Sequence, residues 1–374
     1  MVVDQFDSPE HVMHRAIELA YQGRGHVEPN PLVGAVIVDD DLNLLGEGYH
    51  TRFGAPHAEV EALKNAERRS SNVKNTTAVV TLEPCQHQGK TPPCTEALIA
   101  AGIRRVIIGS VDPAAHTSGS GIDALKNAGL EVETGMLQPE CDRLIAPFRM
   151  LQQNKRPWVH AKWAMTLDGK TAAHTGSSKW ISGAESRAIV HQLRGRMDGI
   201  LVGSGTAQAD DPALTVRPPG ERVPSRIVVD TQARLALDSQ LVQTAHEVPV
   251  LLFCSESAPP AAIESLVTRG VEVVTTSASA SGVDVTAVLL ELGRRNMTNV
   301  LLEGGGGLAG SFFDAGLIDE AHVFIAPKLV GGQSSQTPIA GTGLPSIEGC
   351  PRIEFPTIQQ CGADIYVNGP IARA

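Results

Sequence analysis

The sequence predicts a two-domain α/β protein, and three features indicate this fold class. The chain has 374 residues, which is more than one domain usually contains. Strand-like apolar runs alternate with amphipathic helical stretches along its length, a pattern typical of sheets covered by helices. A polar segment that ends in proline, 150–157, divides this pattern in two. We therefore expect domains at 1–148 and 155–374, joined by a short linker.

The first half shows helix and strand signals in alternation. Ser8-Pro9-Glu10 is a capped helix start with proline at the first helical position, and Gly23 can end that helix. The expected strands are 34–39, 44–50, 77–82, 104–112 and 130–135, and the further expected helices are 57–68, 95–102 and 121–129. This alternation predicts a largely parallel sheet.

The second half repeats the alternation with other lengths. The expected strands are 157–165, 199–204, 225–230, 248–253, 271–276, 299–303 and 321–327, and the expected helices are 185–196, 259–270 and 285–295. This segment is therefore a second α/β unit. Its histidines His160, His174 and His191 show no partner pattern, so we expect them to be ordinary polar residues.

Composition and charge exclude several classes of protein. The net charge is −10, whereas nucleic-acid binders usually carry a basic surplus, so we expect no nucleic-acid partner. No apolar run has the length of a membrane span, and no signal peptide is visible, so we expect a cytoplasmic protein without membrane contact. Six cysteines are too few for a disulfide scaffold, and four of them are expected to be small buried residues: Cys141, Cys254, Cys350 and Cys361.

The other two cysteines belong to a predicted catalytic zinc site. HAEV (57–60) begins a predicted helix, and EPCQHQGKTPPC (83–94) follows the next strand. His57, Cys85 and Cys94 supply three ligands, which leaves one position open for water. Zinc lowers the pKa of such a water, and Glu59 can take its proton and return it to leaving ammonia. The pattern resembles the zinc deaminase signature, with a longer spacer between the cysteines.

Two other interpretations of these residues stay open. One is a closed structural zinc site with His87 as the fourth ligand, and the other is a pair of buried cysteines without metal. The acid beside the ligand histidine and the position at a strand end favour the catalytic interpretation.

A glycine-rich segment marks a nucleotide site in the second half. GGGGLAG (304–310) lies between a predicted strand and a predicted helix, where backbone N–H groups can approach a pyrophosphate. The segment lacks a clear acidic ribose partner about 20 residues further on, so a standard Rossmann domain is not predicted. A flexible glycine turn is the alternative.

Longer motifs connect both halves to one family. HAEV together with EPCQHQGKTPPC closely resembles the deaminase domain of the bifunctional riboflavin-pathway pyrimidine deaminase/reductase family. Gln88 and Lys90 replace the family's usual histidine and arginine. PNPLVG (29–34) is similar to the family's pyrimidine-contacting segment, which implies substrate contacts for Asn30 and His87; a plain turn is the alternative for Asn30. Loop 112–121 departs from the family pattern, so its contacts with the substrate phosphate stay unassigned.

The second half resembles the reductase half of the same family through four motifs in the same order. They are KWAMTLDGK (162–170), SSKWISG (177–183), VGSGTAQADDPALTVR (202–217) and EGGGGLAG (303–310). The resemblance implies a cytidine-deaminase-like three-layer α/β/α domain followed by a dihydrofolate-reductase-like α/β domain. It also implies zinc and NADPH as cofactors, and it suggests a homo-oligomer.

The resemblance assigns roles to residues of the second half. NADPH would contact Ala164, Trp180, Thr206, Asp210, Thr231, Gly304, Gly305, Gly306, Gly307, Leu308, Ala309 and Gly310, and substrate would contact Ser178, Arg194, Leu214, Arg217 and Glu303. Lys162 and Asp210 are the candidates for polarising or protonating the ribose. Without the resemblance, Trp180 could be a core residue, Arg194 a surface charge and Lys162 a solvated strand end.

The expected function is therefore deamination of a diaminopyrimidinone ribosyl phosphate, followed by reduction of its ribose to a ribityl chain. One rival is a nucleoside or tRNA base deaminase with an unrelated nucleotide-binding second domain. Another rival is a zinc-containing, nucleotide-sensing protein without catalysis. A third alternative is that only one half is active. The altered loop 112–121 would then indicate that the deaminase is the inactive half.

Overall fold

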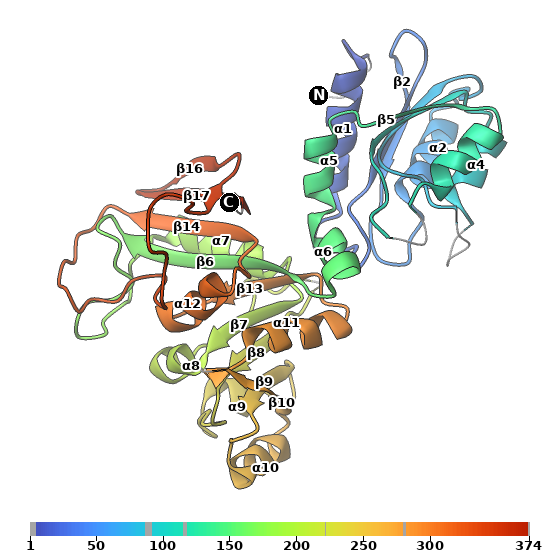
Figure 1. The fold of residues 1–374 in the computed structure, drawn as a ribbon. Coiled ribbons are helices and arrows are strands. Elements are labelled where there is room, and N and C mark those ends of the chain that lie inside the picture. Colours follow the sequence, from blue (N-terminus) through green and yellow to red (C-terminus); the bar gives the residue numbers. More distant parts are fainter. Residues whose placement is uncertain (1–4, 87–91, 115–117, 221, 280–281, 373–374) are drawn as a thin grey trace. The chain divides into compact units, whose positions relative to one another are not determined.

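The computed structural model of the chain divides into two compact units, Met1–Lys155 and Arg156–Ala374 (Figure 1). The structure describes residues 5–86, 92–114, 118–220, 222–279 and 282–372. In these ranges no helix is long and apolar enough to cross a membrane.

The first unit is a sheet of β1 to β5 covered by helices on both faces. Its strands are β1 (Gly34–Val38), β2 (Leu44–Tyr49), β3 (Thr77–Leu82), β4 (Arg105–Ser110) and β5 (Glu131–Thr134). Its helices are α1 (Pro9–Gln22), α2 (Ala58–Arg68), α3 (Cys94–Ala100), α4 (Ser120–Asn127), α5 (Gln138–Leu144) and α6 (Ala146–Asn154). Ser8 caps α1 by accepting from the His11 N–H, as its position before proline predicts.

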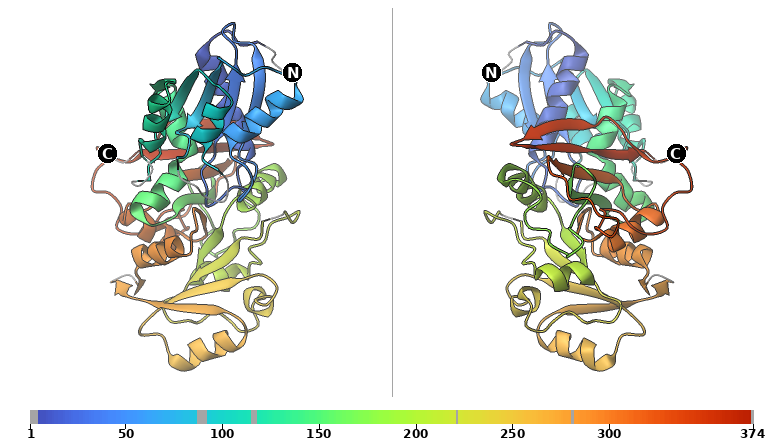
Figure 2. Two further views of the ribbon diagram at one scale, coloured as in Figure 1. Left: turned by 90° about the vertical axis from the view of Figure 1, so that its right-hand side faces the viewer. Right: turned by 90° about the vertical axis from the view of Figure 1, so that its left-hand side faces the viewer.

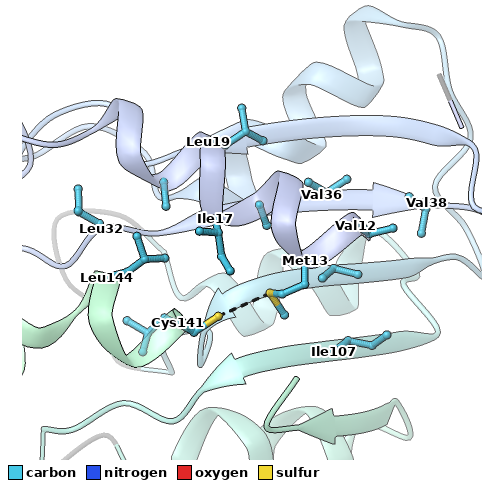
Figure 3. Packing of buried hydrophobic residues seen from close by; sticks show 14 of the residues in the cluster. Val12, Met13, Ile17, Leu19, Leu32, Val36, Val38, Ile107, Cys141 and Leu144 are labelled. Atoms are coloured by element: carbon cyan, nitrogen blue, oxygen red, sulfur yellow. Dashed lines mark hydrogen bonds between the residues drawn. The ribbon is translucent and has the colours of Figure 1, made fainter. Parts of the chain in front are cut away.

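Two separate apolar clusters fill the spaces above and below this sheet. One cluster joins α1 and α5 to one face, with Met13, Val36, Ile107 and Cys141 in contact (Figure 3). The other joins α2, α3 and α4 to the opposite face. The unit therefore has the expected three layers.

The sheet of the first unit is less parallel than the alternation predicts. Its order is β2-β1-β3-β4-β5, and β1 pairs antiparallel with both β2 and β3. Only β3, β4 and β5 run parallel. The reason is that no helix lies between β1 and β2, so the chain returns through a short turn, which joins antiparallel strands.

The second unit is built on one long sheet in the order β10-β9-β8-β7-β13-β6-β14-β17-β15. The strands are β6 (Trp158–Thr166), β7 (Gly199–Gly203), β8 (Ser225–Val229), β9 (Val250–Ser255), β10 (Glu272–Thr276), β13 (Asn299–Glu303), β14 (Glu320–Ala326), β15 (Arg352–Ile353), β16 (Thr357–Cys361) and β17 (Asp364–Ala372); β16 pairs with β17, and β11 (Ala278–Ser279) and β12 (Gly282–Val283) pair separately. The sheet extends from the yellow strands β9 and β10 at one edge to the red C-terminal strands at the other (Figure 2).

Helices cover both faces of the second sheet as well. They are α7 (Ala184–Arg194), α8 (Ser204–Asp210), α9 (Gln240–Gln243), α10 (Pro260–Thr268), α11 (Val285–Arg294) and α12 (Gly306–Asp314). Apolar contacts place α11 and α12 on one face and α7 to α10 on the other. In the sheet order, the neighbouring strands β10, β9, β8, β7, β13, β6 and β14 all run parallel, so their carboxyl ends lie along one edge of the sheet.

The boundary between the two units lies within 150–157, where the linker is expected, but the linker itself is shorter. Most of 150–157 forms the end of α6, and only Lys155, Arg156 and Pro157 lie between α6 and β6. The helix begins with proline near its first position, which fixes a helical φ there. Cys350 is partly exposed, whereas Cys141, Cys254 and Cys361 are buried as expected.

Candidate functional site

The predicted zinc ligands of the first unit meet at one point, although they come from three segments. His57 directly precedes α2, Cys85 follows β3, and Cys94 is the first residue of α3. The His57 Nδ1 atom lies 3.3 Å from the Cys94 sulfur and 3.5 Å from the Cys85 sulfur. One ligand atom from each residue lies within 4.8 Å of the others. Tetrahedral zinc with these donors would hold adjacent ligand atoms about 3.6 Å apart, so the site fits zinc.

The charges in this cluster suit a cation. The hydrogen bond with the Cys94 thiol, together with His57 nearby, lowers the pKa of Cys85 to about 4. The same hydrogen bond raises the pKa of Cys94, which keeps its proton while no cation is bound. The backbone N–H of Cys94 also donates to the Cys85 sulfur over 3.4 Å. One thiolate is therefore ready to bind a metal ion, and binding would release the second proton.

Glu59 lies in the first turn of α2, beside the ligands, and is 3 % exposed. Burial, and next the charge of Cys85, raises the pKa of its carboxyl to about 7. A carboxyl group with a pKa near the working pH can both accept and release a proton. Glu59 thus lies beside the ligands, and the raised pKa of its carboxyl suits the proton transfer expected of it.

Asn30 is held next to this cluster by a residue that the sequence analysis missed. The Asn30 Nδ2 atom lies 3.2 Å from His50 Nε2, and His50 Nδ1 lies 3.1 Å from the Pro56 carbonyl oxygen. The ring of His50 meets the ring of His57 edge to face, with centroids 5.3 Å apart. Burial lowers the pKa of His50, which favours its neutral form. In that form His50 donates to Pro56 and accepts from Asn30. The expected contact of His87 lies outside the described residues.

Glu83, at the start of EPC, organises the loop whose family pattern is altered. Its buried carboxylate accepts four backbone N–H groups, from Asp112, Gly119, Gly121 and Ile122, over 2.9 to 3.3 Å. The last three belong to the start of α4. An acid directly after a buried strand is the only sequence signal of this role, because its partners lie 29 to 39 residues further on.

We expect Glu83→Gln to loosen α4 without removing the zinc ligands. Glutamine keeps one acceptor oxygen but turns an NH₂ group toward two of the four N–H groups, at a cost of about 2 kcal/mol. Hydrogen exchange in peptides covering 120–127 should therefore become faster, by more than tenfold. Glu96→Gln, at an exposed position of α3, is the control. Equal protection in both variants would contradict the role of Glu83.

In the second unit, three predicted residues form one charged group around the buried carboxylate of Glu303. Lys162 of β6 is in register with Glu303, the last residue of the neighbouring strand β13. Arg194, at the end of α7, donates to both Glu303 oxygens, over 2.7 and 2.9 Å. Burial opposes the charge of Glu303, but Arg194 and Lys162 hold its pKa below the usual value. Burial lowers the pKa of Lys162. Arg194 is not a surface charge, and Lys162 is not a solvated strand end.

His191, expected to be an ordinary polar residue, belongs to the same group. It lies one turn before Arg194 on α7. Burial lowers its pKa, as do the charges of Arg194 and Arg217, while Glu303 raises it. Arg217 is exposed and lies in the loop after α8. Burial and the two nearby positive charges therefore favour the neutral form of His191.

Four parallel strands bring further predicted residues to one edge of the sheet. The strands β8, β7, β13 and β6 are adjacent. Ala164 lies in the last part of β6, Thr206 in α8 directly after β7, Thr231 after β8, and Gly304 after β13. Carboxyl ends of neighbouring parallel strands are where α/β sheets bind their ligands.

The glycine-rich segment 304–310 has exposed residues at its start and closely packed glycines within α12. Gly304 has φ +124°, and the Gly305 N–H donates to the Thr206 hydroxyl over 2.8 Å. A Cβ atom at Gly306 or Gly310 would lie 2.4 or 2.5 Å from the backbone of Thr337 or Ala340. These two glycines allow the segment 337–341 to approach α12. Gly304, Gly305 and Gly307 are exposed and Leu308 is partly exposed, whereas Ala309 and Gly310 are buried.

The remaining predicted residues have different surroundings. Trp180 is 65 % exposed, with the Arg187 guanidinium 4.6 Å above its ring, so it is not a core residue. Ser178 lies two residues earlier in the same loop. Asp210 ends α8 and is exposed, 3.9 Å from the Lys179 ammonium. The Leu214 side chain is buried in the core near α8, so only its backbone is left for a ligand.

Comparisons with known proteins agree for both units. Residues 7–110 match the model of the cytidine and deoxycytidylate deaminase zinc-binding region, and residues 157–367 match the model of the RibD C-terminal domain. The riboflavin biosynthesis protein RibD of Actinobacillus pleuropneumoniae is 43 % identical over 356 residues, which are 95 % of this chain and 93 % of that protein. RibD of Escherichia coli is 37 % identical, over 96 % of this chain and 98 % of that one.

Solved structures of full-length relatives share the fold. A deaminase/reductase from Thermotoga maritima has a TM-score of 0.83 at 35 % identity, and covers 98 % of each chain. Acinetobacter baumannii RibD has a TM-score of 0.82 at 34 % identity, over 97 % of this chain and 99 % of that one. The expected fold class, a cytidine-deaminase-like domain followed by a dihydrofolate-reductase-like domain, is confirmed. The chain belongs to the family of the riboflavin biosynthesis protein RibD.

Proposed function

We propose that this chain catalyses two successive steps of riboflavin biosynthesis. The first is hydrolytic deamination of 2,5-diamino-6-(5-phosphoribosylamino)pyrimidin-4(3H)-one, and the second is NADPH-dependent reduction of the ribosyl group to a ribityl chain. The Thermotoga maritima relative is named for both activities. The convergence of His57, Cys85 and Cys94 beside the buried acid Glu59 carries the proposal, because a purely structural zinc site has no need of that acid.

Each residue of the deaminase site has a proposed role in the reaction. Zinc, when bound by His57, Cys85 and Cys94, would lower the pKa of a water molecule. Glu59 accepts a proton in its ionised form and returns it to the departing amine, and burial favours this return because it raises the pKa of the Glu59 carboxyl. Asn30, oriented by neutral His50, presents its amide oxygen to the pyrimidine. His87 is kept as a proposed substrate contact.

The reductase residues would act at the sheet edge of the second unit. NADPH, when bound there, would supply the hydride. Lys162 donates a hydrogen bond to the ribose oxygen as the ring opens, and its lowered pKa eases release of the proton. Asp210 is proposed to assist this step and to contact NADPH. Arg217 suits the substrate phosphate, since arginine binds phosphate through paired hydrogen bonds.

The other proposed contacts divide between the two ligands. Trp180 offers an exposed ring face to the nicotinamide. Ala164, Thr206, Thr231 and the segment 304–310 would contact NADPH, with the buried residues Ala309 and Gly310 at the end of this segment. Ser178, Arg194, Glu303 and the Leu214 backbone would contact the substrate.

One assay tests both steps at once. Zinc-loaded enzyme, the pyrimidine substrate and NADPH are mixed, and ammonia release and NADPH loss are followed in one sample. We expect Cys85→Ser to lose the zinc ion of the first unit and ammonia release, but to oxidise NADPH normally when given the deaminated substrate. Loss of both activities would contradict independent sites. Deamination of cytidine, or of adenosine in RNA, in place of the pyrimidine would favour the rival base deaminase.

We also propose a cytoplasmic location, small-molecule partners and a homo-oligomeric assembly. All six cysteines are free thiols, which suits the reducing cytoplasm. The negative net charge favours small-molecule partners over nucleic acid. The exposed apolar side chains of Ile358 and Ile365 on β16 and β17 support a homo-oligomer.

A further inference from the structure

Two histidines and a glutamate of the second unit converge in a way that the proposed reactions do not use. His160 lies on β6, and Glu320 and His322 lie on the neighbouring strand β14. The His160 Nδ1 atom is 3.2 Å from His322 Nε2, and the two oxygens of Glu320 lie 3.4 Å from the first and 3.3 Å from the second. Both rings are buried.

These separations match the spacing of ligands around a metal ion. Zinc–nitrogen and zinc–oxygen bonds of about 2.0 to 2.2 Å, arranged as a tetrahedron, place adjacent ligand atoms about 3.3 to 3.6 Å apart. Two imidazoles and one carboxylate are also a donor set that zinc and related divalent ions accept. The three residues need no movement to serve as ligands.

The outer nitrogens of both rings are fixed by hydrogen bonds. The Asn299 Nδ2 group donates to Thr298, which directs Asn299 Oδ1 toward His160 Nε2, 3.1 Å away. His160 therefore carries a proton on Nε2, and its Nδ1 lone pair faces the cluster. His322 Nδ1 lies 2.7 Å from the Tyr366 hydroxyl, which can accept as well as donate. Such outer partners orient metal-binding histidines in proteins.

One lone pair already faces the centre of the cluster. With its proton on Nε2, His160 has an acceptor nitrogen at Nδ1, which lies 3.2 Å from His322 Nε2 and 3.4 Å from a Glu320 oxygen. His322 has two tautomers here: with its proton on Nε2 it donates to His160, and with its proton on Nδ1 it donates to the Tyr366 hydroxyl and offers a second lone pair to a cation. A divalent ion would therefore take the place of the shared proton.

We propose that His160, Glu320 and His322 bind a second divalent metal ion, zinc foremost, in the reductase unit. The ion would link β6 to β14 at His160, two residues before Lys162. It would thereby stabilise the strand that carries Lys162. The Glu320 side chain is 25 % exposed, which gives an ion access to the site. This proposal does not depend on the proposed reactions.

Metal counting on the full chain tests the proposal. Protein stripped with a chelator is dialysed against zinc ions alone, and bound zinc is measured. We expect two ions per wild-type chain, one in Cys85→Ser, one in His322→Gln, and none in the double variant. Zinc should also raise the unfolding temperature of Cys85→Ser, followed by tryptophan fluorescence, because all three tryptophans belong to the second unit.

Two further variants separate metal binding from misfolding. Glu320→Gln keeps the size of a partly exposed side chain, and we expect at least tenfold weaker binding of the second ion. His174→Gln, at an exposed position of the same unit, should bind as the wild type does. A single ion in the wild type, no ion in Cys85→Ser, or unchanged binding in Glu320→Gln and His322→Gln would overturn the proposal, and a hydrogen bond between His322 and His160 would then explain the cluster.

Discussion

Replacing Glu59 by Gln should abolish ammonia release while leaving the metal and the reductase in place. Glutamine has the same size but cannot take up and return a proton, and loss of a positioned acid/base group lowers a rate about a hundred- to ten-thousandfold. Glu59 is not among the three ligands, so zinc content should not change. Stability should not fall, because an amide replaces a carboxyl that is 3 % exposed. Ammonia release and zinc content measured on the same preparation check this result.

The control for Glu59→Gln lies on the same helix. Glu61→Gln changes a partly exposed acid of α2 whose partner is Lys64, 3.0 Å away, and should leave ammonia release unchanged. NADPH oxidation with deaminated substrate should be equal in both variants. If Glu59→Gln releases ammonia within twofold of the wild type, another group carries the proton and the assignment is wrong.

The elements and site residues that could be predicted are those whose sequence pattern is local. Helical spacing and apolar runs predict α1, α2 and the central strands, because burial of one face leaves a regular pattern in the chain. The zinc ligands could also be predicted, since His57, Cys85 and Cys94 are chemically distinctive residues at element ends. Their convergence follows from the sheet order, because β2 and β3 flank β1 and both run antiparallel to it, so the segments that follow them leave the sheet at the same edge.

The residues that escaped prediction depend on partners far away in the chain. His50 acts through Asn30 and His57, and Glu83 through N–H groups of 112–122. His160 and His322 meet because β6 and β14 are neighbours in the sheet, an order that no local pattern specifies. The antiparallel β1 was missed for the same reason, since alternation shows that strands exist and not which of them pair.

The largest loss of stability is expected from Arg194→Met. The variant would leave the Glu303 carboxylate buried, with a side-chain exposure of 9 %, and without its two hydrogen bonds from the guanidinium. Removing one partner of a buried ion pair costs about 3 to 5 kcal/mol. Denaturant unfolding followed by tryptophan fluorescence measures this, because Trp158, Trp163 and Trp180 all lie in the second unit. Arg294→Met breaks a pair whose arginine is 80 % exposed, and should cost less than about 1 kcal/mol.

The double variant Arg194→Met, Glu303→Gln separates folding from catalysis. An amide without a charge is far cheaper to bury than an unpaired carboxylate, so the double variant should regain much of the lost unfolding free energy. It should stay inactive as a reductase, because both side chains are proposed substrate contacts. Recovery of stability without activity would mean that the ion pair is kept for the substrate and not for the fold. If Arg194→Met alone is no less stable than Arg294→Met, the carboxylate is not held by Arg194 in solution, and the charge arrangement around Lys162 must be revised.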